Sequence, residues 1–190
     1  MTQRISAGIL LFRRGAAAGA GADGVEPADG VEPAGGGEPA GGGAAPAGAL
    51  EVLLGHPGGP FFAGRDLGAW SIPKGEVALG EDLYVEARRE FEEETGHVPP
   101  APPAAIPIPL GSIVQKGGKI VHAWALEGDL DPATAVSNTF SMRWPPIVGA
   151  MTAFPEIDRV AWFAPEEARR RMKSAQTPFI DRLEEVLRVG

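Results

Sequence analysis

Residues 75–96 read GEVALGEDLYVEARREFEEETG, and this segment says more about the chain than any other. It holds eight acidic residues and only two basic ones, whereas an ordinary solvated helix mixes the two signs and so avoids self-repulsion. Carboxylates crowded in this way usually need a cation to neutralise them. The segment therefore predicts an element that presents a negative cluster, with a plain charged helix surface as the alternative.

The local signals predict a helix that begins near Glu81 and Asp82 and ends before Gly96. Acidic side chains suit the positive end of the helix dipole, and glycine is the usual residue just past a helix C-terminus. Side chains three or four positions apart share one helix face, and here they are Glu90, Glu93 and Glu94, with Glu86 one turn earlier. Their oxygens suit a hard cation such as Mg2+. An adjoining apolar stripe that can pack on a core contains Tyr84, Ala87 and Phe91.

The same segment matches the pattern G-x5-E-x7-R-E-U-x-E-E-x-G-U, in which U is a bulky aliphatic residue. The residues on the pattern are Gly75, Glu81, Arg89, Glu90, Phe91, Glu93, Glu94 and Gly96. The last position departs from it, because His97 stands where the pattern has an aliphatic residue. The chain thus resembles the Nudix hydrolase family. The run from Gly68 to Gly75, GAWSIPKG, is similar to the same region in the MutT-like and diadenosine polyphosphate hydrolase branch.

The resemblance implies a role for each of these residues. Glu93, Glu94 and Arg89 would be catalytic residues, with Glu93 or Glu94 also orienting or deprotonating the attacking water. Arg89 would pair with a glutamate of the motif and hold its conformation. Glu81 would be structural or accessory. The implied ligands of a Mg2+ or Mn2+ cofactor are Glu90, Glu93, Glu94 and a backbone carbonyl near Lys74.

Other candidate site residues lie outside the motif. Lys74 could meet a substrate phosphate, His56 could offer its imidazole to phosphates, and Trp70 could stack on a base. A plain turn for His56 and a core position for Trp70 are the alternatives. Relatives differ in their general base, and some take it from the loop before the last strand. Glu156 and Asp158 occupy that loop here, and a solvated turn is the alternative for each.

The implied reaction is metal-dependent hydrolysis of a pyrophosphate bond in a nucleoside diphosphate linked to another group. We expect a dinucleoside polyphosphate or a (d)NTP as substrate. The alternatives are a non-catalytic nucleotide-binding module, or a hydrolase of ADP-ribose, inositol pyrophosphate or RNA 5′ ends. Because such modules usually lose glutamates of the motif, the intact set favours an enzyme.

Composition sets limits on this function. With 190 residues and 44% hydrophobic content, residues 1–190 can form one domain with a real core. The chain has no cysteine, which excludes disulfides and thiolate metal sites. A net charge of −8 disfavours an extended nucleic-acid surface. The apolar run at residues 9–12 is too short for a signal peptide or a membrane span, so we expect a cytoplasmic protein. We also expect a monomer or a homodimer that binds a small nucleotide substrate.

The remaining segments predict an α/β fold in which a mixed sheet lies between helices. Residues 15–49 repeat DGVEPA-like units and cannot bury enough apolar surface to become ordered, so we interpret them as a low-complexity insert between the first two strands. A hexapeptide solenoid is disfavoured because the repeats lack aliphatic residues. The expected strands are residues 5–12, 50–55, 110–115, 119–126 and 159–163, with helices starting at Pro165 and covering residues 179–189. Residues 70–72 are expected to be extended, and residues 138–152 irregular.

Overall fold

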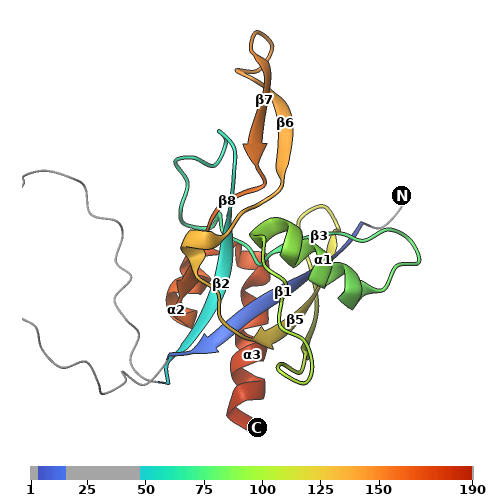
Figure 1. Cartoon of the computed structure of the whole chain (residues 1–190), viewed down its shortest axis with the longest axis vertical. Helices are drawn as coiled ribbons and strands as arrows, with labels where there is room; N and C mark the ends of the chain where they lie inside the picture. The colour runs from blue at the N-terminus through green and yellow to red at the C-terminus, as the bar shows by residue number, and fades with distance from the viewer. Residues whose placement is uncertain (1–3, 16–47, 190) are drawn as a thin grey trace, which may run out of the picture.

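The computed structural model describes residues 4–15 and 48–189 of the chain. Its strands are β1 (Ile5–Arg14), β2 (Leu50–Pro57), β3 (Lys74–Glu76), β4 (Ile108–Val114), β5 (Ile120–Glu127), β6 (Thr139–Trp144), β7 (Ala150–Pro155) and β8 (Ile157–Phe163). Its helices are α1 (Leu83–Thr95), α2 (Pro165–Arg171) and α3 (Thr177–Val189), with short 3-10 turns η1 (Pro132–Thr134) and η2 (Ser174–Gln176). The predicted α/β fold, a mixed sheet between helices, is confirmed (Figure 1).

The main sheet has the strand order β4-β5-β1-β2-β8, and the short β3 also pairs with β1. Strand β1 runs parallel to β5 and antiparallel to β2 and β3. Its side chains alternate between two cores, so Ile9 packs with residues of α1 while Leu10 packs with residues of α2 and α3. Because both faces of β1 are covered, its sequence is almost continuously apolar.

Helix α1 carries the acidic motif and has both of the expected ends. The Asp82 side chain accepts hydrogen bonds from the backbone N–H groups of Tyr84 and Val85, each at 2.9 Å. Gly96 adopts the left-handed conformation (φ 74°), and its N–H donates to the Glu92 carbonyl. Buried Ala87 and Phe91 attach the helix to the sheet, and Glu90, Glu93 and Glu94 lie beside this apolar stripe, where they line a pocket.

The expectation of irregular structure at residues 138–152 is wrong. This part of the chain forms β6 and β7, a separate two-stranded antiparallel sheet that projects from the main body (Figure 1). The reason lies in the period-two alternation of Phe140, Met142 and Trp144 with polar residues, which favours a strand, while Pro145 and Pro146 lie in the turn. The hairpin is held to the body by aromatic contacts, since the Phe61 and Trp144 ring centroids lie 5.2 Å apart.

The predicted insert falls mostly on residues that the structure does not describe, so its character stays a prediction. Its two ends are described, and they meet. The Gly15 N–H donates to the Ala49 carbonyl at 2.8 Å, and the Gly48 N–H donates to the Gly15 carbonyl at 2.7 Å.

The segment at residues 70–72 is extended and makes only isolated bridges, from Trp70 to Met172 and from Ser71 to Gly55. Among the described helices, none has the length and apolarity to cross a membrane.

Candidate functional site

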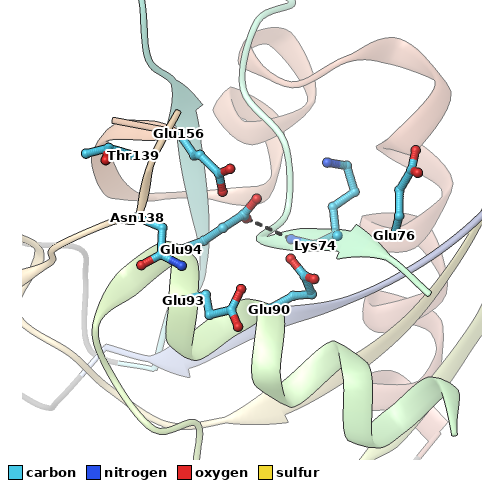
Figure 2. Close-up of a pocket in the computed structure, with 9 residues that line it drawn as sticks. Lys74, Glu76, Glu90, Glu93, Glu94, Asn138, Thr139 and Glu156 are labelled. Carbon is cyan, nitrogen blue, oxygen red and sulfur yellow. Dashed lines mark hydrogen bonds between the residues drawn. The ribbon is translucent and has the colours of Figure 1, made fainter. Parts of the chain in front are cut away.

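A polar pocket of about 620 Å³ opens between α1, β3 and the base of the β6–β7 hairpin (Figure 2). Its lining residues are Lys74, Gly75, Glu76, Glu90, Glu93, Glu94, Asn138, Thr139 and Glu156. The hairpin base is held against α1 because the Asn138 N–H donates to the Glu93 carbonyl at 2.9 Å. Asn138 in turn accepts a hydrogen bond at its carbonyl from the Glu156 N–H at 2.8 Å. These two bonds bring Glu156 over the carboxylates of α1.

Glu94 is the most strongly perturbed carboxylate of the pocket. Its Oε2 accepts a hydrogen bond from the Lys74 backbone N–H at 2.8 Å, which ties α1 to β3 (Figure 2). Burial raises the pKa of Glu94 to about 7, against the opposing effect of Lys74, and the charges of Glu90 and Glu156 raise it further. Burial also raises the pKa of Glu90, with the charges of Glu93 and Glu156 adding to it against the effect of Arg89. The pocket therefore carries more negative charge than its own cations neutralise.

Gly75 shows why the motif needs a glycine before the helix. A Cβ atom at this position would lie 1.8 Å from Oε2 of Glu90 and 1.9 Å from its carboxylate carbon. No side chain fits in that space, so only glycine lets the Glu90 carboxylate approach the backbone of β3.

Arg89 binds three glutamates of its own helix. Its Nε donates to Glu86 at 2.8 Å, and its two terminal nitrogens donate to Glu90 at 2.7 Å and to Glu93 at 2.6 Å. The pairing that the sequence predicted for Arg89 is therefore present. The guanidinium fixes the side chains of Glu90 and Glu93 without lying among the residues that line the pocket.

A divalent cation fits this pocket by the chemistry of its donors, because five carboxylates line one cavity and hard cations prefer oxygen ligands. In the described part of the chain, no three acidic or histidine side chains already converge around one point as a metal site. Glu90 and Glu93 turn toward Arg89, while Glu94 binds the Lys74 N–H. The metal ligands predicted from sequence therefore stay a prediction, and binding would require these side chains to turn.

Two of the predicted substrate-binding residues lie in the interior. The His56 side chain has no exposed surface, and its Nδ1 and Nε2 lie 2.8 Å from Asp158 Oδ1 and 2.5 Å from the Arg65 carbonyl. Trp70 is only 2% exposed, and its indole N–H donates to Asp66 at 2.8 Å. The alternatives for these two residues, a turn and a core position, describe them better than contact with a phosphate or a base. The sequence could not show which way either ring points.

Other candidates do reach the pocket. Lys74 and Glu156 both line it, whereas Asp158 is engaged with His56 and drops out as the alternative base. Glu81 accepts a hydrogen bond from the Ala78 N–H at 3.1 Å, which fits a structural role.

Sequence reasoning missed three lining residues. They are Glu76, Asn138 and Thr139. The position of Glu76 next to Gly75 of the motif could have indicated that it lines the pocket. Asn138 and Thr139 stand at the start of the segment whose alternation of apolar and polar residues predicts a strand.

Comparison with known proteins establishes the family. A family model described as the NUDIX domain matches residues 47–183, and the chain belongs to the Nudix family. This match confirms the predicted family and the predicted fold.

The individual relatives share limited sequence identity with this chain. An 8-oxo-(d)GTP phosphatase of Mycolicibacterium smegmatis is 36% identical over 88 residues, which cover 43% of this chain and 25% of that protein. The chain thus spans about a quarter of the length of this curated relative. An Ap4A hydrolase of C. elegans, in a binary complex, aligns over 97% of this chain and 99% of its own at 17% identity, with a TM-score of 0.55. The NUDIX domain of Shewanella oneidensis NrtR, complexed with ADP ribose, aligns over 98% and 90% at 15% identity, with a TM-score of 0.53. These two structures are similar in fold.

Proposed function

We propose that the chain hydrolyses a phosphoanhydride bond of a dinucleoside polyphosphate or a (d)NTP, by attack of water on phosphorus with Mg2+ or Mn2+ bound. The observation that carries this proposal is the pocket in which Glu90, Glu93 and Glu94 face Glu156, with Lys74 at the rim. Phosphoryl transfer needs positioning and charge neutralisation more than covalent chemistry, and this donor set offers both. The names of the relatives, 8-oxo-(d)GTP phosphatase and Ap4A hydrolase, agree with this class of substrate.

Each carboxylate has a distinct task in this proposal. Glu90, Glu93 and Glu94 hold the cation, which when bound neutralises phosphate oxygens and lowers the pKa of water. Arg89 keeps Glu90 and Glu93 in place through the two hydrogen bonds described above. The backbone N–H of Lys74 orients Glu94, and the Lys74 ammonium contacts a phosphate.

Glu156 is the carboxylate best placed to accept the proton of the attacking water. Among the described residues its carboxylate forms no hydrogen bond or ion pair, whereas Glu93 and Glu94 are both engaged. It also faces α1 from across the pocket (Figure 2), so a water could lie between Glu156 and the cation. Glu93 and Glu94 are the other candidates for this step.

The test is turnover of a substrate panel with Mg2+ by the wild-type chain and by Glu93→Gln, Glu156→Gln and Glu92→Gln. The panel contains diadenosine tetra- to hexaphosphates, canonical and 8-oxo nucleoside triphosphates, ADP-ribose, NADH and an inositol pyrophosphate. We expect hydrolysis of one polyphosphate class, with kcat reduced about 100-fold or more in the first two variants. Glu92 is exposed on the same helix and does not line the pocket, so Glu92→Gln should retain full activity.

The outcomes separate the candidate functions. Saturable binding of a nucleotide without turnover of any substrate would refute the hydrolase and indicate a nucleotide-binding module. Turnover that survives in Glu93→Gln would show that the reaction does not use this pocket. Reaction in 18O-labelled water identifies which phosphorus is attacked, because the label appears in only one of the two products.

A further inference from the structure

Three lysines lie close enough for their charges to influence one another, and one of them lines the carboxylate pocket. They are Lys74 in β3, Lys119 just before β5 and Lys173 between α2 and η2, and we call them the lysine group. Lys74 belongs to the lysine group and also to the residues that line the pocket. The proposed hydrolysis assigns no role to Lys119 or Lys173.

Backbone contacts bring the segments that carry the three lysines close to the N-terminal half of β1. Lys74 pairs with Gly8 of β1, and a Cβ on Gly8 would lie 2.5 Å from the Lys74 Cβ, so the lysine side chain starts directly over Gly8. Even-numbered side chains of β1 face α2 and α3, and Lys74 therefore leaves the sheet on that face. The Lys173 N–H donates to the Trp70 carbonyl at 2.9 Å, which places Lys173 beside the chain that leads into Lys74.

Lys119 lies near the same part of β1 because it directly precedes β5, which pairs with β1. The N–H of Ile120 donates to the Arg4 carbonyl at 2.9 Å, and the Lys119 Nζ lies 3.6 Å from Glu76 Oε1. Glu76 also accepts a hydrogen bond from Arg4 Nε at 2.9 Å, so this single carboxylate is shared between two cations. The Lys119 side chain is 21% exposed, which leaves its ammonium within reach of a ligand.

The lysine group is only partly neutralised by its surroundings. Burial lowers the pKa of Lys173, and the positive charges of Lys74 and Lys119 lower it further, against the opposing charge of Glu94. Burial likewise lowers the pKa of Lys119, followed by the charge of Lys74. Among the ion pairs of the described residues, Lys119 has a partner in Glu76, whereas Lys74 and Lys173 have none. Three ammonium groups that repel one another, one of them lining the carboxylate pocket, form a place for an anion with several charges.

We propose that the lysine group binds phosphoryl groups that extend beyond the two phosphoryl groups at the carboxylates, so that the substrate is a nucleotide with three or more linked phosphates. This inference rests on the proposed function and adds the residues that bind the phosphoryl groups of its substrate beyond the first two. Lys74 lies beside the carboxylates of α1 (Figure 2) and also belongs to the lysine group, so a phosphate chain can run from the carboxylates past Lys74 to the other two lysines.

The first experiment measures binding without catalysis. Isothermal titration calorimetry in EDTA at low salt follows inorganic tripolyphosphate and inorganic pyrophosphate binding to the full chain. The chains compared are wild type, Lys119→Gln/Lys173→Gln and Lys116→Gln. Lys116 is a matched control, because it is an exposed lysine of the same β4–β5 turn. We expect the double variant to weaken tripolyphosphate binding by about tenfold or more, and Lys116→Gln by less than about twofold.

Two results would overturn the inference: no binding of tripolyphosphate by wild type, or equal losses of tripolyphosphate binding in the double variant and in Lys116→Gln. Circular dichroism and the thermal midpoint of each variant establish that it is folded. Because the titration needs neither metal nor turnover, it gives a clear result even if the chain hydrolyses nothing.

A second experiment tests the substrate class where the chain is active. With Mg2+, KM for a diadenosine polyphosphate should rise about tenfold or more in the double variant, while kcat changes little, since these lysines bind the chain away from the reacting phosphorus. A fall in kcat with unchanged KM would contradict a binding role. Faster wild-type hydrolysis of ADP-ribose than of every longer phosphate chain would refute the substrate class and leave the proposed hydrolase intact.

Discussion

Replacing Glu94 with glutamine should stabilise the metal-free protein above pH 7 while removing part of its stabilisation by Mg2+. The structure supplies the reason, because burial raises the pKa of this carboxyl from 4.5 to about 7. A raised carboxyl pKa means that the folded state prefers the protonated form. Below pH 4.5 both the folded and the unfolded chain are protonated, and the group costs nothing. As pH rises from 4.5 through 7, the unfolded chain ionises first and the free energy of unfolding falls.

The magnitude follows from the two pKa values. Each unit of pKa corresponds to about 1.4 kcal/mol, so the ionised Glu94 lowers the free energy of unfolding by about 3 kcal/mol above pH 7 and by under about 1 kcal/mol at pH 5. Glutamine keeps an oxygen that can accept the Lys74 N–H, and it carries no charge. The stability gained in Glu94→Gln over wild type should therefore be about 2 kcal/mol larger at pH 8 than at pH 5.

Urea denaturation in EDTA at constant ionic strength measures this difference. Glu92→Gln serves as the control, because Glu92 is exposed on the same helix, and its effect should not change with pH. Added Mg2+ at pH 8 should stabilise wild type more than Glu94→Gln, since the cation binds the ionised carboxylate. A gain in Glu94→Gln that is the same at both pH values would refute the argument from burial. Equal stabilisation of both chains by Mg2+ would show that Glu94 is not a metal ligand.

Three further perturbations test other parts of the structure. Gly75→Ala should lower kcat/KM by about 100-fold or more, because its Cβ would displace the Glu90 carboxylate, while circular dichroism stays that of a folded protein; wild-type turnover would show that Glu90 need not approach β3. His56→Ala should lower the free energy of unfolding by about 2–4 kcal/mol and leave KM within about threefold, because the ring is buried against Asp158; a large rise in KM with unchanged stability would restore a role in phosphate binding. Deletion of residues 17–47 should leave the thermal midpoint and kcat/KM nearly unchanged, since the flanking chain is already closed by backbone hydrogen bonds; loss of folding or activity would contradict the interpretation as an insert.

The motif on α1 was predictable from sequence because its signals are local. Asp82 and Gly96 set the ends of the helix through bonds to residues within four positions, and the spacing of the glutamates places them on one face. The same holds for β1, whose apolar run requires two covered faces. The hairpin at β6 and β7 was harder to predict, because the alternation of Phe140, Met142 and Trp144 favours a strand whereas the two prolines that follow favour irregular structure.

The sequence by itself determined the family, the carboxylate helix and the positions of the main strands along the chain, because each depends on the spacing of residues within a short segment. Only the tertiary structure decided which other side chains reach the pocket. Glu156 arrives there because the hairpin base bonds to the end of α1, while His56 turns inward to Asp158 although both lie near strand ends. Lys119 and Lys173 come together across 54 residues because their segments lie close to the N-terminal half of β1, and no local pattern encodes that proximity.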